Sequence, residues 1–216
     1  MALGKSKKFN SATNVYSVNY RNKDKVTGKS TFQVKKKVDG AFQRLEDVTD
    51  ISGTLLGVKH KVTPWQGKTI ESIDLTLLDN EDIYFVSFPL SISTRSLFNA
   101  MFNLKTFENL EIGTYMSKPK VQGGNSYAQI CLRQNGEMIR WKYALDQIPK
   151  ADEIVFKGQK MRDYTKTDAF FLGQLAELQK VIESRPTSNK AEVPDVELPT
   201  TEPEVEAPGK DEDVPF

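Results

Sequence analysis

Apolar and polar residues alternate one by one in a series of short segments through the middle of the chain. Phe32, Val34 and Val38 alternate with polar residues in segment 30–38. The same two-residue period occurs in residues 51–62, 69–78, 83–88, 127–133 and 138–143. Because successive side chains of a strand point to opposite faces, this pattern predicts half-buried strands. With the hairpin signal Asn135-Gly136, it predicts a mainly β, antiparallel body.

Two other segments have the spacing of helices. Leu97, Phe98 and Met101 recur on one helical face that Ser93 could cap, and residues 167–184 form a second such face. Several strands, a helix and then further strands is the order of an OB-fold. We therefore expect an OB-fold-like antiparallel barrel with one or two helices, although other small barrels share parts of this order.

The composition changes abruptly at residue 186. Residues 186–216 hold six of the ten prolines and nine acidic residues against two lysines, a net charge of −7. Residues 1–185 hold 28 basic and 20 acidic residues, a net charge of +8. Such a proline-rich, self-repelling segment is predicted to be disordered. The expected organisation is a basic arm (1–10), one folded domain (11–185) and an acidic tail (186–216).

The tail ends in Asp211-Glu212-Asp213-Val214-Pro215-Phe216. This tip resembles the C-terminal peptide of bacterial and phage single-stranded DNA-binding proteins, in which acids precede an apolar residue, Pro and a final Phe. Val214 departs from the usual Ile by one methylene. The resemblance implies that a partner protein holds Phe216 in an apolar pocket while its basic side chains bind the acids. The expected partners are replication proteins such as a polymerase, helicase or primase.

Few residues suggest catalysis, a metal site or a cofactor. His60 is the only histidine and Cys131 the only cysteine, which excludes a metal site rich in histidine and an internal disulfide. We therefore expect no enzyme activity, no metal and no cofactor. No run of 18 apolar residues is present, so we expect no membrane contact and a cytoplasmic protein, in a bacterial host if the source is viral.

Basic residues are instead interleaved with aromatic ones. Single strands are bound by cations that follow the phosphates and by flat side chains that stack on bases. The candidate nucleic-acid-binding residues are Lys35, Lys37, Lys59, Lys61, Trp65, Lys68, Tyr115, Lys118, Lys120, Tyr127, Arg133, Arg140, Trp141 and Lys142. Within the last group, alternation places Arg140 and Lys142 on one face of a strand and Trp141 and Tyr143 on the other.

These patterns predict a protein that binds and protects single-stranded DNA in replication, recombination or repair and recruits other proteins through its tip. One alternative is a β-barrel adaptor or virion protein that binds only proteins. Another is a nuclease that uses Asp74 and Asp82 with a divalent ion.

Overall fold

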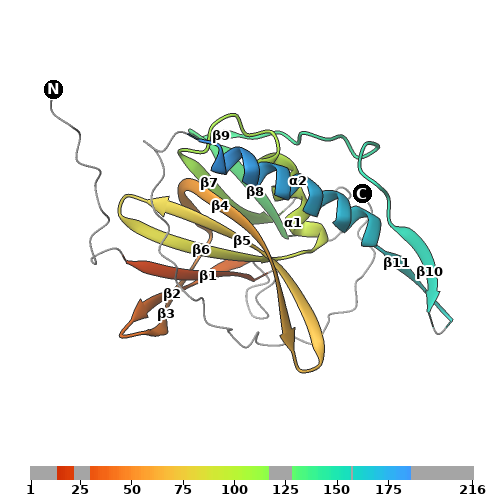
Figure 1. Ribbon diagram of the computed structural model, residues 1–216, viewed down its shortest axis with the longest axis horizontal. Helices are drawn as coiled ribbons and strands as arrows, with labels where there is room; N and C mark the ends of the chain where they lie inside the picture. The colour runs from red at the N-terminus through yellow and green to blue at the C-terminus, as the bar shows by residue number, and fades with distance from the viewer. Residues whose placement is uncertain (1–13, 22–29, 117–127, 157, 186–216) are drawn as a thin grey trace.

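The structure is a computed structural model that describes residues 14–21, 30–116, 128–156 and 158–185. The helices are α1 (Ile92–Met101) and α2 (Thr165–Glu183). The strands are β1 (Val15–Arg21), β2 (Thr31–Val38), β3 (Ala41–Val48), β4 (Asp50–Trp65), β5 (Lys68–Asp79), β6 (Asp82–Pro89), β7 (Leu110–Met116), β8 (Ala128–Gln134), β9 (Glu137–Met138), β10 (Asp152–Phe156) and β11 (Gln159–Asp163). Nine strands form one sheet in the order β3-β2-β1-β6-β5-β4-β7-β8-β9, and β10 and β11 form a separate ribbon (Figure 1). The prediction of a mainly β body is confirmed.

One long strand, β4, joins the two parts of this sheet. Its first residues pair with β7 and the rest pair with β5. At the changeover, Gly53 has φ +151°, and a Cβ there would lie 2.8 Å from the carbonyl oxygen of Leu78. A bulge follows between Leu55 and Gly57. Because a bulge adds one residue to one strand, Leu55 and Val58 both face the core although they are three residues apart.

The two faces of the sheet differ sharply in character. On one face, Val18 of β1 pairs with Val34 and Val86, and Leu75 pairs with Val86 and Val58. All five side chains are buried. Alternate positions on the same strands carry mostly polar and basic residues, but Ile83 and Phe85 of β6 are apolar and buried. Ser17, Gln33 and Asp74 on this face are buried as well, so the face opposite the core is mostly polar and partly buried.

The helices cover the core face (Figure 1). Phe98 of α1 packs edge-on against Phe88 of β6, with ring centroids 6.3 Å apart. Helix α2 lies along β4 at its bulge, where Gln179 Oε1 accepts a 2.6 Å hydrogen bond from the Val58 N–H. Just after α2, the guanidinium of Arg185 donates to the Leu55 carbonyl at 3.0 Å. The bulge leaves the Val58 N–H and the Leu55 carbonyl in need of partners, and Gln179 and Arg185 supply their hydrogen bonds.

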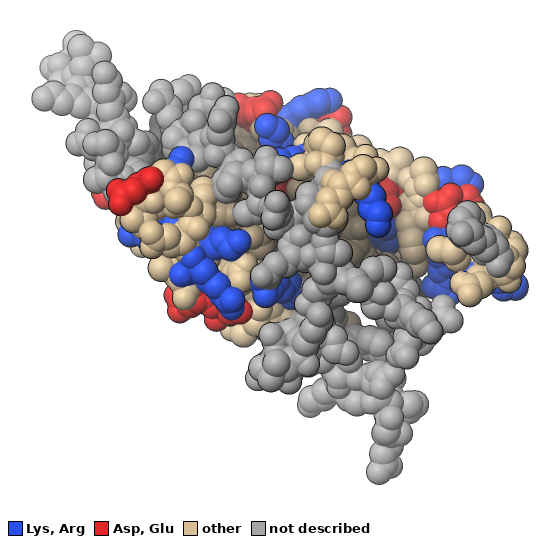
Figure 2. Space-filling model, turned by 90° about the horizontal axis from the view of Figure 1, so that it is seen from below, with Lys and Arg blue, Asp and Glu red and all other residues tan. Residues whose placement is uncertain are grey.

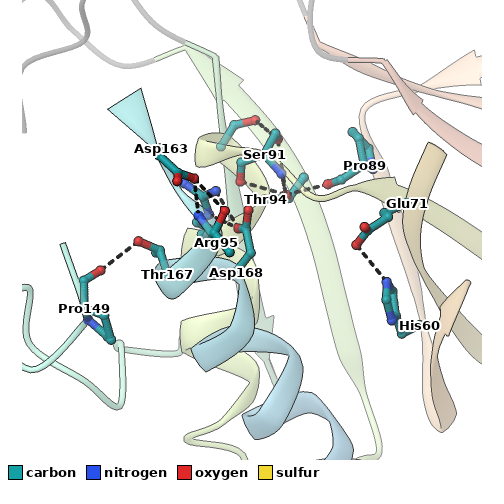
Figure 3. A network of polar contacts seen from close by, with 12 residues as sticks. His60, Glu71, Pro89, Ser91, Thr94, Arg95, Pro149, Asp163, Thr167 and Asp168 are labelled. Atoms are coloured by element: carbon teal, nitrogen blue, oxygen red, sulfur yellow. Dashed lines mark hydrogen bonds and ion pairs between the residues drawn. The ribbon is translucent and has the colours of Figure 1, made fainter. Parts of the chain in front are cut away.

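An ion pair joins the two helices to each other. Arg95 of α1 donates from Nε and Nη2 to Asp168 Oδ1 of α2, at 3.1 and 2.6 Å (Figure 3). The same guanidinium lies over the ring of Tyr164, 4.3 Å from its centroid. Helix α1 begins after Ser91, whose N–H donates to Thr94 Oγ1 at 3.0 Å. The prediction that Ser93 caps this helix is therefore wrong by two residues.

The predicted OB-fold-like antiparallel barrel is wrong in one respect, because the described sheet is not closed into a barrel. Strands β3 and β9 are free edges of the described sheet, and β1 pairs with β6 in parallel. The sheet curls without closing. Its two parts approach each other where Thr114 Oγ1 of β7 donates to the carbonyl of Ser30, the residue before β2, at 2.8 Å. The additional hairpin β2–β3 extends the sheet beyond the five strands of an OB-fold.

Further differences concern the end of the chain. The strand predicted for residues 138–143 is only β9, and residues 139–151 have no regular structure. The helix predicted for residues 167–184 is confirmed as α2. The predicted basic arm (1–10) and acidic tail (186–216) lie outside the described residues. In the part of the chain that the structure describes, no helix is long and apolar enough to span a bilayer.

Candidate nucleic-acid interface

Four of the predicted lysines lie on the sheet face opposite the core. Lys35 and Lys37 belong to β2, and Lys59 and Lys61 belong to β4. The pairing connects them across the sheet. One row of directly opposite residues crosses five neighbouring strands, from Lys35 through Ser17, Phe85 and Thr76 to Gly57. Gly57 lies two residues before Lys59 on β4. Since paired residues share a face, these lysines share one surface, called here the basic face.

None of the four lysines forms an ion pair with a residue that the structure describes. Lys59 is exposed, and Lys35, Lys37 and Lys61 are half-buried. A view from below shows Lys and Arg side chains gathered on the side of the molecule where β1, β2 and β3 lie, with acidic side chains beside them (Figure 2). The charges of the four lysines are therefore not neutralised by acidic groups in the described part of the chain.

Polar groups lie among the lysines of the basic face. Asp74 of β5 is opposite Lys59 and is 8% exposed. Its Oδ1 accepts hydrogen bonds from the hydroxyls of Ser72 at 3.2 Å and Ser87 at 2.7 Å. These two bonds satisfy the buried carboxylate. Asp74 is thus held by hydrogen bonds to neighbouring residues of the sheet.

The geometry does not support a shared metal site for Asp74 and Asp82. Asp74 is opposite Ser87, and Asp82 is five residues before Ser87 on β6. Five strand residues span about 17 Å, and an odd separation places the two carboxylates on opposite faces. Among the described residues, no group of His, Cys, Asp and Glu could hold a metal ion.

The β4–β5 hairpin carries two further candidates at its end. Trp65 and Lys68 are directly opposite each other, and their register places both positions on the basic face. Lys68 is exposed, whereas the side chain of Trp65 lies outside the described part of the structure. Lys118, Lys120 and Tyr127 also lie outside the described residues.

Tyr115 and Arg133 lie on the outward face of the second part of the sheet. The Tyr115 hydroxyl donates to Gln129 Oε1, and burial raises the pKa of Tyr115 above its ordinary value. Arg133 forms an ion pair with Glu111, the residue directly opposite it, and this hydrogen bond raises the pKa of Arg133. Both side chains have partners within the protein, so they are less available to a ligand than the four lysines.

The structure separates Arg140, Trp141 and Lys142 from the basic face. They lie in the irregular segment after β9, next to α1, where the Lys142 N–H donates to the Asn99 carbonyl at 3.2 Å. Trp141 is 47% exposed. Tyr143 packs against Phe170, with ring centroids 5.2 Å apart. Because this segment is not a strand, the predicted division into two faces is wrong.

The register adds residues to the basic face that alternation alone did not suggest. Asn19 pairs with Gln33 and with Ser87, which extends the polar row from β2 to β6. Arg44 of β3 is opposite Lys35 and is ion-paired with Asp47 at 3.0 Å. The order of the strands, which places β1 between β2 and β6, was the missing information.

The two remaining candidates for reactive chemistry, His60 and Cys131, each contact another group of the protein. His60 Nε2 lies 3.1 Å from Glu71 Oε2 on the β4–β5 hairpin (Figure 3). Cys131 is buried, with Sγ 3.5 Å from the carbonyl oxygen of Gly113.

Comparison of the chain with models of known protein families, with curated proteins and with solved structures finds no match.

Proposed function

We propose that the protein binds single-stranded nucleic acid along the basic face. The observation that carries this proposal is the alignment of Lys35, Lys37, Lys59 and Lys61 on one sheet surface without ion-pair partners among the described residues. A ligand with regularly spaced negative charges, such as a polynucleotide backbone, matches such a surface.

Binding would draw on the release of counterions from the phosphates. Each phosphate neutralised on a single strand contributes about 0.7 to the slope of log K against log salt concentration. Four lysines that each contact one phosphate therefore give a slope of about −3. The hydroxyl of Thr76, which shares the face and is half-buried, is a suitable further donor to phosphate or sugar.

The acidic tip supports a role in which the bound strand is presented to other proteins. Asp211, Glu212 and Asp213 precede Val214, Pro215 and Phe216. In the proposed function, these residues dock a replication, recombination or repair protein while the basic face holds single-stranded DNA. The negative charges of Asp211, Glu212 and Asp213 repel the phosphates of the bound strand, which keeps the tip free for a partner protein.

A protein-only adaptor is the second candidate, favoured by the β10–β11 ribbon. Ile154 and Met161 are directly opposite each other on this ribbon and are 41% and 48% exposed, and Val155 is 71% exposed. A two-stranded ribbon with exposed apolar side chains is a plausible surface for a protein partner.

Titration of a fluorescent oligothymidylate at several salt concentrations distinguishes the two functions. The proposed function predicts binding that weakens with salt with a slope near −3, and weaker binding to a duplex of the same length. An adaptor predicts no binding to either oligonucleotide at low salt. A matched oligouridylate in the same assay measures the preference for DNA over RNA.

A further inference from the structure

A cavity of about 410 Å³ lies away from the basic face, between α1, the start of α2, residues 141–151 and β11. Ile92, Leu145, Ile148 and Phe171 contribute apolar walls, and Trp141 lies at its margin. Leu145 is 51% exposed, so the apolar surface is accessible. A pocket of this size and character is of the kind that binds a small apolar group.

The charges around the cavity are of one sign. Of the residues that the structure describes, Arg95, Lys150 and Arg162 line it and no acidic residue does. Arg95 is neutralised by Asp168 (Figure 3). Lys150 and Arg162 are exposed and have no ion-pair partner among the described residues. The cavity therefore combines an apolar interior with two available cations.

Three other polar side chains of the wall already have hydrogen-bond partners. Ser96 Oγ donates to the Ser93 carbonyl at 2.8 Å, Thr167 Oγ1 to the Pro149 carbonyl at 2.7 Å and Asn99 Nδ2 to the Tyr143 carbonyl at 2.8 Å. A phenyl ring placed against these walls has no polar edge that needs a further partner.

We infer that this cavity binds the C-terminal tip of the same chain. Val214-Pro215-Phe216 supplies an apolar segment with a ring, and the terminal carboxylate with Asp211, Glu212 and Asp213 supplies the negative charge that Lys150 and Arg162 attract. The inference goes beyond the proposed function and requires no nucleic acid.

The tail is long enough to reach the cavity. The helix residues that line the cavity, Thr167 and Phe171, precede Arg185 by 18 and 14 positions. At 1.5 Å per helical residue, this is a span of roughly 20–27 Å. A Gly-rich coil of 31 residues has a root-mean-square length of about 30 Å, and a proline-rich, charged sequence such as 186–216 is expected to extend further. The effective concentration of a tethered ligand falls with roughly the 3/2 power of tether length beyond the span.

Because the tip is tethered to the same chain, even a weak intrinsic affinity of the cavity for the tip is sufficient for docking. Effective concentrations for such tethers are in the millimolar range. With a dissociation constant of about 0.1 mM and an effective concentration of about 1 mM, roughly nine-tenths of the cavities would be occupied. A partner protein must then compete with the cavity for the tip, so only a partner that binds the tip more strongly than the cavity does is recruited.

Photo-cross-linking in the full chain tests the inference. With p-benzoylphenylalanine at position 216 and no nucleic acid present, irradiation is expected to attach the tip to residues 92–99 or 141–151. A mixture of isotopically light and heavy protein is expected to give cross-links within one chain only. Attachment to β2 or β4, attachment between copies, or no attachment would each overturn the inference.

Charge reversal at the margin gives a matched comparison. Arg162→Glu is expected to remove most of the cross-link, and Asp213→Lys in the same chain is expected to restore part of it. Lys160→Glu makes the same change on the same strand but outside the cavity, and is expected to leave the yield unchanged. Equal losses in the two β11 variants would contradict the inference.

Fluorescence of Trp141 gives a readout that needs no change in the cavity. In a chain with Trp65→Phe, Trp141 is the only tryptophan. Adding Phe216→Ala is expected to increase quenching of Trp141 by acrylamide, because an empty cavity leaves its margin open to solvent. Unchanged quenching would count against docking of the tip.

Discussion

Replacing Lys35, Lys59 and Lys61 with alanine removes three charges from the basic face. If each lysine contacts one phosphate, the slope of log K against log salt falls in magnitude by about 2, from about −3 to about −1. Relative to 1 M salt, each contact increases affinity about fivefold at 0.1 M, so the triple variant is expected to bind oligothymidylate about 100-fold more weakly there. The fold should survive, because surface substitutions usually change the free energy of unfolding by less than about 0.5 kcal/mol.

Fluorescence anisotropy with a labelled oligothymidylate between 0.05 and 0.5 M salt measures both quantities. The matched control replaces Lys160, Lys166 and Lys180, which are exposed, ion-paired and located on β11 and α2. The control lowers the net charge by the same three units, so it separates local contacts from the general charge of the protein. An unchanged slope in the first variant, or an equal loss in the control, would refute the assignment of the basic face.

Three further predictions concern the fold that presents this face. Gln179→Ala is expected to lower the free energy of unfolding by about 1–3 kcal/mol in urea denaturation, because the Val58 N–H loses its acceptor, whereas Gln179→Glu keeps one. Gly53→Ala is expected to destabilise the protein because the added methyl group meets the Leu78 carbonyl, and a lowered thermal midpoint would show it; an unchanged midpoint would contradict the close approach. Burial raises the pKa of Tyr84 to about 12, above 10.0 for the free side chain, so the stability that Tyr84 contributes is complete below pH 10 and is lost as the pH rises toward 12. Absorbance titration should show a late tyrosine step that is missing in Tyr84→Phe, and the same late step in both proteins would contradict this.

Alternation predicted most strands of the sheet because it follows directly from burial on one face. The segment around Phe32 and Val34 and the segment around Ile73 and Leu75 both became strands with these side chains in the core. The bulge in β4 was not predictable in this way. It shifts the alternation by one, so Leu55 rather than Leu56 is buried.

The order of strands was likewise outside the reach of local patterns. Parallel pairing of β1 with β6 joins segments more than 60 residues apart, and it is this pairing that brings Lys35 and Lys59 onto one surface. For Trp141, alternation implied a strand. Its segment instead lies next to α1 and is held by hydrogen bonds between Asn99 and Tyr143, a contact between residues 44 positions apart.

The central claim is that a single strand lies across β2 and β4. Photo-cross-linking of an oligonucleotide that contains 4-thiothymidine, followed by mass spectrometry of the attached peptides, tests it most directly. We expect cross-links within residues 31–38 and 57–68, and we expect them to disappear at 0.5 M salt. Cross-links confined to α2 or to the β10–β11 ribbon, or none at low salt, would contradict the account.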